Sequence, residues 1–366
     1  MEQPQARVKG ARTESNVMHY DALIAERQRR IAERNLAFHE LHQKYADDLG
    51  RLMTESVRKS VAAICDEHRV VYNQSLAETI GQADQMEVRR RKLLADLDHA
   101  LRKQVPNYAE LKRVNQTFAG AFRSAVGATS RPAKWQIHPG DWAPLDLGEV
   151  WEFSPPYDLS DLFAFAGFIE PSHSGFGLFN QSSVDPRLGF INNDIIFFDD
   201  NRLFDRSDVF SAADSVVSVG VNFTAPRRGS LNVGLTMRNL YSRAHIDVTN
   251  DFGFSSAHIA VNHDLTLNVV RGDSTVTVLS QPVWPPGAGT LSDPGGDDFH
   301  LVLPTTPAGP VTLATQIEGN PIAAGEHIQV LGGCETSVIL RASNMDCTIP
   351  VALWWYVEKL RVWLSD

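Results

Sequence analysis

The chain has 366 residues, of which 43% are hydrophobic and 21% are charged, and its formal net charge is −10. This composition is typical of a soluble, folded protein with enough apolar material for at least one large core. No window approaches the roughly 18 consecutive apolar residues of a membrane-spanning helix, which excludes an integral helical membrane protein. The first residues are polar and lack the apolar stretch of a secretory signal. We therefore expect the chain to be cytoplasmic as synthesised, and release by a non-classical route stays open.

Charge and composition divide the chain near residue 130. Residues 1–130 contain 21 Lys and Arg against 17 Asp and Glu, whereas the remainder contains 13 against 27. The first part is rich in helix formers, and the second part has alternating runs of Val, Thr, Phe and Trp that favour strands. We expect an α+β protein with a disordered polar arm over residues 1–17. A helical bundle or coiled-coil stalk should follow over residues 18–130, and an antiparallel β-sandwich, jelly-roll-like, over residues 131–366.

A heptad-like seam runs through the first helical segment. Its members recur every seven residues: Ile24, Ile31, Phe38, Tyr45 and Leu52. We interpret this seam as an assembly surface, either inside an antiparallel bundle or between chains of a stalk. Arg27, Arg34 and Asp48 stand where a strict second seam residue is expected. The helix therefore packs against a partner that is not a regular heptad helix, or part of this face is exposed to solvent.

Helix start and stop signals in the helical part predict three helices, over residues 18–72, 76–105 and 108–126. Ser75 and Glu78 have the spacing of a capping box, in which the two side chains satisfy each other's free backbone amides. This pattern predicts that a new helix starts at Leu76. Asn107 followed by Glu110 gives a similar signal for the third helix.

After residue 131 the hydrophobic period changes to alternation. About ten alternating runs predict a sandwich or jelly roll whose regular part covers residues 215–366. Residues 131–214 are less regular and rich in aromatic residues, and LSDLFAFAGF after Asp158 suggests a short helix. This part is either an elaboration of the sandwich or a small separate domain.

One acidic cluster offers a candidate metal site. It consists of Asp199, Asp200, Asn201 and Asp205, which follow an apolar run. Carboxylate and amide oxygens are hard ligands suited to Ca²⁺. The cluster lacks the glycine and the final glutamate of an EF-hand, so we favour a solvated loop and expect no cofactor.

Catalytic signatures are missing from the sequence. None of the 12 histidines forms a helical pair with a Glu between, and the chain has no nucleophile elbow and no phosphate-binding loop. An enzyme is therefore the less favoured interpretation. Three scattered cysteines, Cys65, Cys334 and Cys347, indicate a reducing compartment. Pairing of Cys334 with Cys347 stays open beside two buried thiols.

The adjacent pair Trp354 and Trp355 lies in a predicted strand near the end of the chain. Successive strand residues point to opposite faces, so one ring should enter a core and the other should meet a second layer, a partner or a ligand. Exposed aromatic rings on a sandwich suit a carbohydrate-binding or lipid-binding face. We regard both residues as candidates for a binding or interface role.

These features favour a non-enzymatic, self-assembling binding or structural protein. A helical stalk would carry an acidic β-sandwich head that recognises a glycan, a membrane surface or a protein receptor, and the protein would be a homo-oligomer. Nucleic acid is disfavoured, since acidic residues interleave with the basic run at residues 88–92. The alternatives are a helical pore-forming toxin with a β-sandwich targeting domain, which the recurring arginines of the first helix disfavour, and a hydrolase built on the sandwich.

Overall fold

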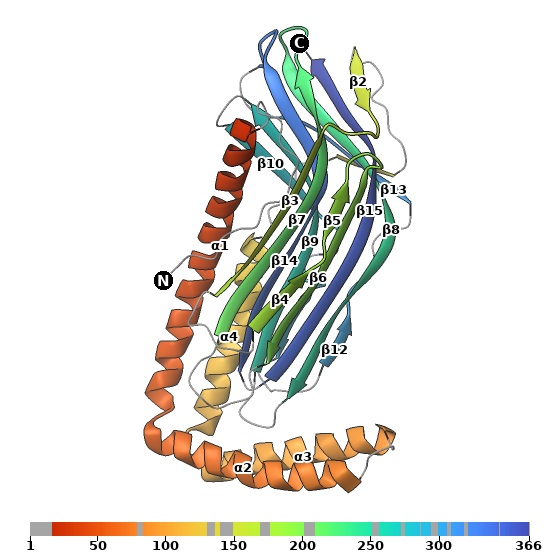
Figure 1. The fold of residues 1–366 in the computed structure, drawn as a ribbon. Helices are drawn as coiled ribbons and strands as arrows, with labels where there is room; N and C mark the ends of the chain where they lie inside the picture. Colours follow the sequence, from red (N-terminus) through yellow and green to blue (C-terminus); the bar gives the residue numbers. More distant parts are fainter. Residues whose placement is uncertain are drawn as a thin grey trace.

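The protein consists of a layer of helices packed on a two-sheet sandwich (Figure 1). The computed structural model describes residues 17–78, 83–129, 136–139, 149–168, 176–200, 209–250, 256–271, 275–285, 287–293, 299–305, 309–317, 321–343 and 345–365. Within these residues it has four helices and then two antiparallel sheets, in agreement with the expected α+β class and sandwich. The expected polar arm lies outside the described residues except for Val17.

The helices are α1 (Val17–Leu52), α2 (Glu55–Glu78), α3 (Ala83–Gln104) and α4 (Tyr108–Thr129). The single helix predicted over residues 18–72 is therefore wrong, because α1 ends at Leu52 and a second helix begins at Glu55. At the break the Thr54 hydroxyl accepts a hydrogen bond from the Val57 amide at 3.4 Å, and Glu55 stands in the first turn of α2. A side-chain cap and an acidic first turn both stabilise a new helix start.

The predicted start at Leu76 is also wrong, because α2 continues through Ser75 to Glu78. A capping box is a local signal, and the surrounding residues 71–78 continue the helix across it. The third predicted helix corresponds to α4. Helices α2 and α3 form a hairpin that crosses one end of the sandwich (Figure 1) and buries Val61, Ile64, Leu97 and Leu101 against one another.

Two sheets face each other across one continuous core. The first, which we call the open sheet, contains β1 (Gln136–Pro139), β2 (Val150–Phe153), β4 (Phe176–Asn180), β5 (Ser183–Asp185), β6 (Phe190–Asp200), β8 (Ser230–Asn250), β12 (Phe299–Val302), β13 (Pro310–Gln316) and β15 (Met345–Ser365). The second, which we call the covered sheet, contains β3 (Leu159–Phe168), β7 (Val209–Thr224), β9 (Ser256–Arg271), β10 (Thr275–Pro282), β11 (Thr290–Asp293) and β14 (His327–Ser343). Nine of the fifteen described strands, β7 to β15, lie within residues 209–365, close to the ten or so predicted for residues 215–366.

The segment after Asp158 forms strand β3, so the predicted short helix is wrong. Leu159, Asp161 and Phe163 face outward toward α1, and Leu162 and Ala166 pack toward the core between the sheets. This alternation has a period of two residues, which suits a strand and not a helix. Pairing with β7 along the whole segment then satisfies its backbone groups.

Helices α1 and α4 lie along the outer face of the covered sheet (Figure 1). The seam side chains Ile31, Phe38 and Tyr45 are buried there, and Ile24 and Leu52 are half-buried. Ile31 packs on Phe163 and Val216 of the strands. The seam therefore packs within the chain. Ile31 contacts strands of the covered sheet, and Phe38 and Tyr45 share a buried cluster with α4 and the sheet.

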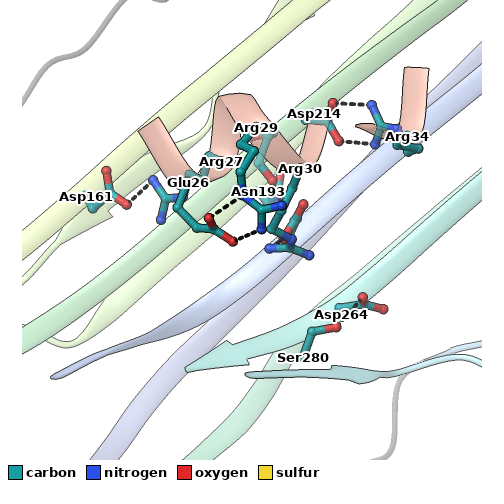
Figure 2. A network of polar contacts seen from close by, with 12 residues as sticks. Glu26, Arg27, Arg29, Arg30, Arg34, Asp161, Asn193, Asp214, Asp264 and Ser280 are labelled. Carbon is teal, nitrogen blue, oxygen red and sulfur yellow. Dashed lines mark hydrogen bonds and ion pairs between the residues drawn. The ribbon is translucent and has the colours of Figure 1, made fainter. Parts of the chain in front are cut away.

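The arginines on α1 meet acidic side chains of the covered sheet (Figure 2). We call Arg27, Arg30 and Arg34 the arginine row. Arg27 lies 2.5 Å from Asp161 of β3, and Arg34 contacts both carboxylate oxygens of Asp214 of β7 at 2.6 and 2.7 Å. Arg27 and Arg34 interrupt the heptad seam because they form ion pairs with Asp161 and Asp214 of the sheet.

Farther along α1, aromatic rings of α1 and α4 enclose a guanidinium from the sheet. Arg341 of β14 is fully buried and lies 4.1 Å from the ring centre of Tyr45 and 4.9 Å from that of Phe118. The Tyr45 hydroxyl donates a hydrogen bond to Asn115 at 2.5 Å. Cation–π contacts of this kind strengthen when they are desolvated, so this end of the helical layer is tied firmly to the sheet.

None of the helices in the described residues is both long enough and apolar enough to cross a bilayer. The division into a helical domain and a sandwich domain stays a proposal, because clusters of buried side chains include residues from both.

We expect Asp214→Asn to lower the free energy of unfolding by about 3 kcal/mol, because it leaves the largely buried Arg34 guanidinium without its counter-charge. Denaturant unfolding of the full chain measures this. Asp185→Asn is the matched control: its partner Arg187 is 85% exposed, so the loss should stay below about 1 kcal/mol. Equal losses in the two variants would contradict a buried ion pair at Asp214.

Candidate binding face of the open sheet

The outer face of the open sheet carries a set of polar and aromatic side chains at its centre. On β15, the residues Leu353 and Trp355 point into the core, so Ala352 and Trp354 point outward. β15 is flanked by β6 on one side and by β8 on the other. Over residues 351–356, each outward residue of β15 therefore stands between one residue of β6 and one of β8.

Trp354 is the centre of an aromatic group. Its side chain is 37% exposed, and its ring centre lies 4.9 Å from that of Tyr241 on β8 and 6.3 Å from that of Phe190 on β6. Tyr241 is 40% exposed. The Asn239 amide donates to the backbone oxygen of Trp354 at 3.2 Å, which holds the β8 bulge against β15 beside these rings. The three rings together present an apolar surface to the solvent.

The next row along the strands is charged and has a small residue at its centre. Ala352 pairs with Asp194 of β6 on one side and with Arg243 of β8 on the other. Because neighbouring strands are about 4.8 Å apart, the two charged residues are separated by about 10 Å at the backbone. In the described part of the chain, neither the Asp194 carboxylate nor the Arg243 guanidinium makes an ion pair or a side-chain hydrogen bond. Both groups are free to contact a ligand.

A second polar group lies farther along the same face. His245 Nε2 is 2.9 Å from one oxygen of Asp247, and the other oxygen contacts His300 Nδ1 from the neighbouring strand β12. The two imidazole rings are 5.4 Å apart between centres. This group extends the polar part of the face along β8.

A buried hydrogen-bond network lies under the aromatic group. The Trp355 indole donates to His263 Nε2 of β9 at 3.1 Å, and His263 Nδ1 contacts the Thr336 hydroxyl of β14 at 2.9 Å. Because an indole nitrogen can only donate, His263 Nε2 is the acceptor and Nδ1 carries the hydrogen. Burial lowers the pKa of His263 to about 3, so the ring stays neutral. The network joins the two sheets, since Asn193 of β6 also donates to Thr336 at 3.0 Å.

The structure places the remaining predicted site residues apart from this face or outside the described residues. Asp199 and Asp200 end β6, whereas Asn201 and Asp205 lie outside the described residues. In the part of the chain that the structure describes, no group of three or more His, Cys, Asp or Glu side chains is arranged to hold a metal ion. Cys65, Cys334 and Cys347 are buried thiols that are not joined in disulfide bonds.

Sequence reasoning brought Trp354 to attention but missed Asp194, Arg243 and Tyr241. Within β6, three consecutive polar residues, Asn192, Asn193 and Asp194, are followed by four apolar ones, so alternation does not mark Asp194 as outward-facing. The sequence also could not place Asp194 opposite Ala352, because the two residues are about 160 positions apart in the sequence.

Comparisons with known proteins leave the family open. No protein-family model matches the chain, and no curated protein matches it by sequence. Among solved structures, the chain is similar to TmCBM61 in complex with β-1,4-galactotriose at 9% identity, over 52% of this chain and 90% of that chain, with a TM-score of 0.13. It is also similar to an isomalto-dextranase of Arthrobacter globiformis T6 complexed with panose, at 14% identity over 51% and 36% of the two chains (TM-score 0.11).

A third similar structure is that of infectious bursal disease virus, Gx strain, at 12% identity over 62% of this chain and 47% of that chain, with a TM-score of 0.11. These scores are too low to support an argument about ligand or function.

The two tryptophans should differ strongly when truncated. Trp355→Ala should lower the free energy of unfolding by about 3 to 5 kcal/mol, because Trp355 is fully buried and the change leaves a cavity and an unpaired His263. Trp354→Ala should cost less than about 1.5 kcal/mol, since much of the ring already contacts water. Thermal melts of both variants test this, and equal losses would show that β15 does not alternate as described.

Proposed function

We propose that the protein binds a glycan on the open sheet, with the Trp354 ring as the central contact. The observation that carries the proposal is the combination of a partly exposed indole, flanked by Tyr241 and Phe190, with a carboxylate and a guanidinium that have no partner of their own among the described residues. A sugar offers both an apolar face for a ring and hydroxyl groups for polar side chains. The protein would thus be a non-enzymatic binding protein.

The polar groups suit hydroxyls because they supply both halves of a hydrogen bond. The Asp194 carboxylate only accepts, and the Arg243 guanidinium only donates. Hydrogen bonds to charged groups are stronger than those between neutral groups. A hydroxylated ligand lying over Ala352 could donate to Asp194 and accept from Arg243 while one of its rings stacks on Trp354.

Charge favours an uncharged glycan over an anionic one. The part of the chain after residue 130 has 27 Asp and Glu against 13 Lys and Arg. Such an excess of negative charge repels polyanions such as nucleic acids or anionic lipid surfaces. The outer face itself carries Asp194 and Asp247 together with Arg243, so its charges are mixed.

Self-association, a coiled-coil stalk and a jelly-roll topology remain predictions from the sequence. The seam side chains Ile31, Phe38 and Tyr45 already pack against the sheet and α4 of the same chain. A homo-oligomer would therefore need a different surface or a rearrangement of the helices. Light scattering of the full-length protein tests the prediction directly.

Binding to an array of neutral oligosaccharides, followed by calorimetry with the best ligand, tests the proposed function. We expect Trp354→Ala to weaken binding at least tenfold, which corresponds to about 1.4 kcal/mol. Asp194→Asn should weaken it by a similar amount, because the amide loses the charge that strengthens the hydrogen bond.

Val88→Ala is the control for these variants. Val88 is an apolar residue with 71% exposure on α3, in the helical hairpin and not on the open sheet. The control should bind like the unmodified protein. Absence of binding to any oligosaccharide, or equal weakening by the control variant, would overturn the proposal.

A further inference from the structure

The first part of α1 lies on the covered sheet without support from α4. Phe38 and Tyr45 share a buried cluster with Phe118 and Phe122 of α4. Leu23 and Ile31 instead belong to clusters whose other described members are strand residues. Figure 1 shows α1 continuing along the sheet beyond the end of α4. Residues 17–37, which we call the clasp, are therefore held mainly by the sheet.

The contacts under the clasp contain an excess of negative charge (Figure 2). The three guanidinium groups of the arginine row face Asp161, Asp214 and Glu335, and Arg30 lies 3.6 Å from Glu335. A fourth carboxylate, Asp264 of β9, stands directly opposite Glu335 in the strand pairing. Its hydrogen-bond partner is the Ser280 hydroxyl at 2.8 Å. Four carboxylates thus meet three guanidinium groups, and no ion pair among the described residues includes Asp264.

Packing beneath the clasp is incomplete. A cavity of about 250 Å³ is lined by Arg27, Arg34 and Phe163, and a second of about 100 Å³ is lined by Asp264, Glu335 and Trp284. Arg30 lines both cavities. Among the described residues, the buried Arg27 Nη2 and Arg34 Nε have no hydrogen-bond partner. Buried donors without a partner cost free energy, so these two nitrogen atoms oppose closure of the clasp.

We propose that the clasp opens from the covered sheet while the rest of the helical layer stays in place, and that ionisation of Asp264 favours the open form. Opening would expose the acidic outer face of β9 and β14 and the arginine row of α1. The hinge would lie just before Phe38, where contact with α4 begins. This device is on the opposite side of the sandwich from the open sheet and does not depend on glycan binding.

The direction of the pH dependence follows from Asp264. Burial, with a smaller contribution from the charge of Glu335, raises the pKa of Asp264 to about 6, while Ser280 and Arg30 act in the opposite direction. An exposed aspartate in the open form has a pKa of about 3.9. The closed form therefore binds this proton more tightly, and it is favoured at low pH. That advantage is lost as the pH rises through 6. The two pKa values give about a tenfold increase in the opening equilibrium between pH 5 and pH 8.

The other charged groups near Asp264 come from every element that packs around it. They are Arg27, Arg30, Glu33 and Arg34 of α1, Asp161 of β3, Asp214 of β7 and Glu335 of β14. His263 lies next to Asp264 in the chain but is neutral over this range, because burial lowers its pKa to about 3. Proximity to Asp214 raises the pKa of Arg34, which opposes its desolvation and keeps it charged.

Hydrogen–deuterium exchange of the full-length protein between pH 5 and pH 8 tests the proposal. After correction for the intrinsic pH dependence of exchange, amides of residues 21–37 should exchange about tenfold faster at pH 8 than at pH 5. Amides of residues 38–52 and of α4 should show no such change. If both parts of α1 exchange together at every pH, the clasp does not open separately and the proposal is wrong.

Two variants separate the role of Asp264 from a general effect of pH. Asp264→Asn cannot ionise, so the corrected exchange of residues 21–37 should lose its pH dependence. Asp185→Asn, on the other sheet, should leave that dependence unchanged. If pH dependence persists in Asp264→Asn, another group controls the clasp.

Ser280→Ala gives a second measurement that retains the carboxylate. The serine hydroxyl stabilises the ionised form, so its loss should move the transition in exchange to higher pH. An unchanged or lower transition would contradict the assignment to Asp264. Glycan binding by the same variants should be unaffected, so failure of the glycan proposal would not imitate failure of this one.

Discussion

Burial of acidic side chains under a helix is the constraint on which the rest of the structure depends. Asp161 and Asp214 are 1% exposed, and an unpaired carboxylate at such a position would be very costly. Arg27 and Arg34 supply the opposite charges from α1 at a spacing of two helical turns. In the closed arrangement, the buried carboxylates of the covered sheet are therefore neutralised by α1. The long helix lies flat on the strands for this reason, and it places Ile31 between the two ion pairs.

The same constraint determines which face of the sandwich is available for binding. With α1 and α4 on the covered sheet, the outer surface of the open sheet is the broad strand surface that the helices leave uncovered (Figure 1). The inner network of Trp355, His263 and Thr336 ties the two sheets together beneath it. Because strand residues alternate, a buried Trp355 requires that Trp354 points outward. A stable core thus positions the ring that we propose as the ligand contact.

Charged side chains are arranged differently on the two faces of the sandwich. On the covered sheet, carboxylates are buried and are balanced by α1, with Asp264 left over. On the open sheet, Asp194 and Arg243 lie on either side of a small alanine and remain unpaired in the described structure. Buried pairs hold layers together, whereas unpaired surface groups can exchange water for a ligand. One face of the sandwich is therefore occupied by internal packing, and the other is the face on which we propose that a glycan binds.

Local patterns in the sequence determined the change from helices to strands near residue 130, the burial of Phe38 and Tyr45, and the opposite directions of Trp354 and Trp355. Each depends on a period of a few residues along one element. Helix ends were less predictable, because a cap such as Thr54 or Ser75 competes with the packing of neighbouring turns.

What covers each face was decided by the tertiary structure. A heptad seam has the same spacing whether it meets a second helix or a sheet, so the sequence alone could not show that Ile31 packs on strands. The row of Asp194, Ala352 and Arg243, and the excess carboxylate Asp264, likewise exist only after strands distant in the sequence pair. The spacing of apolar residues along one element is a local property, whereas the partner of each side chain depends on how distant segments of the chain pair.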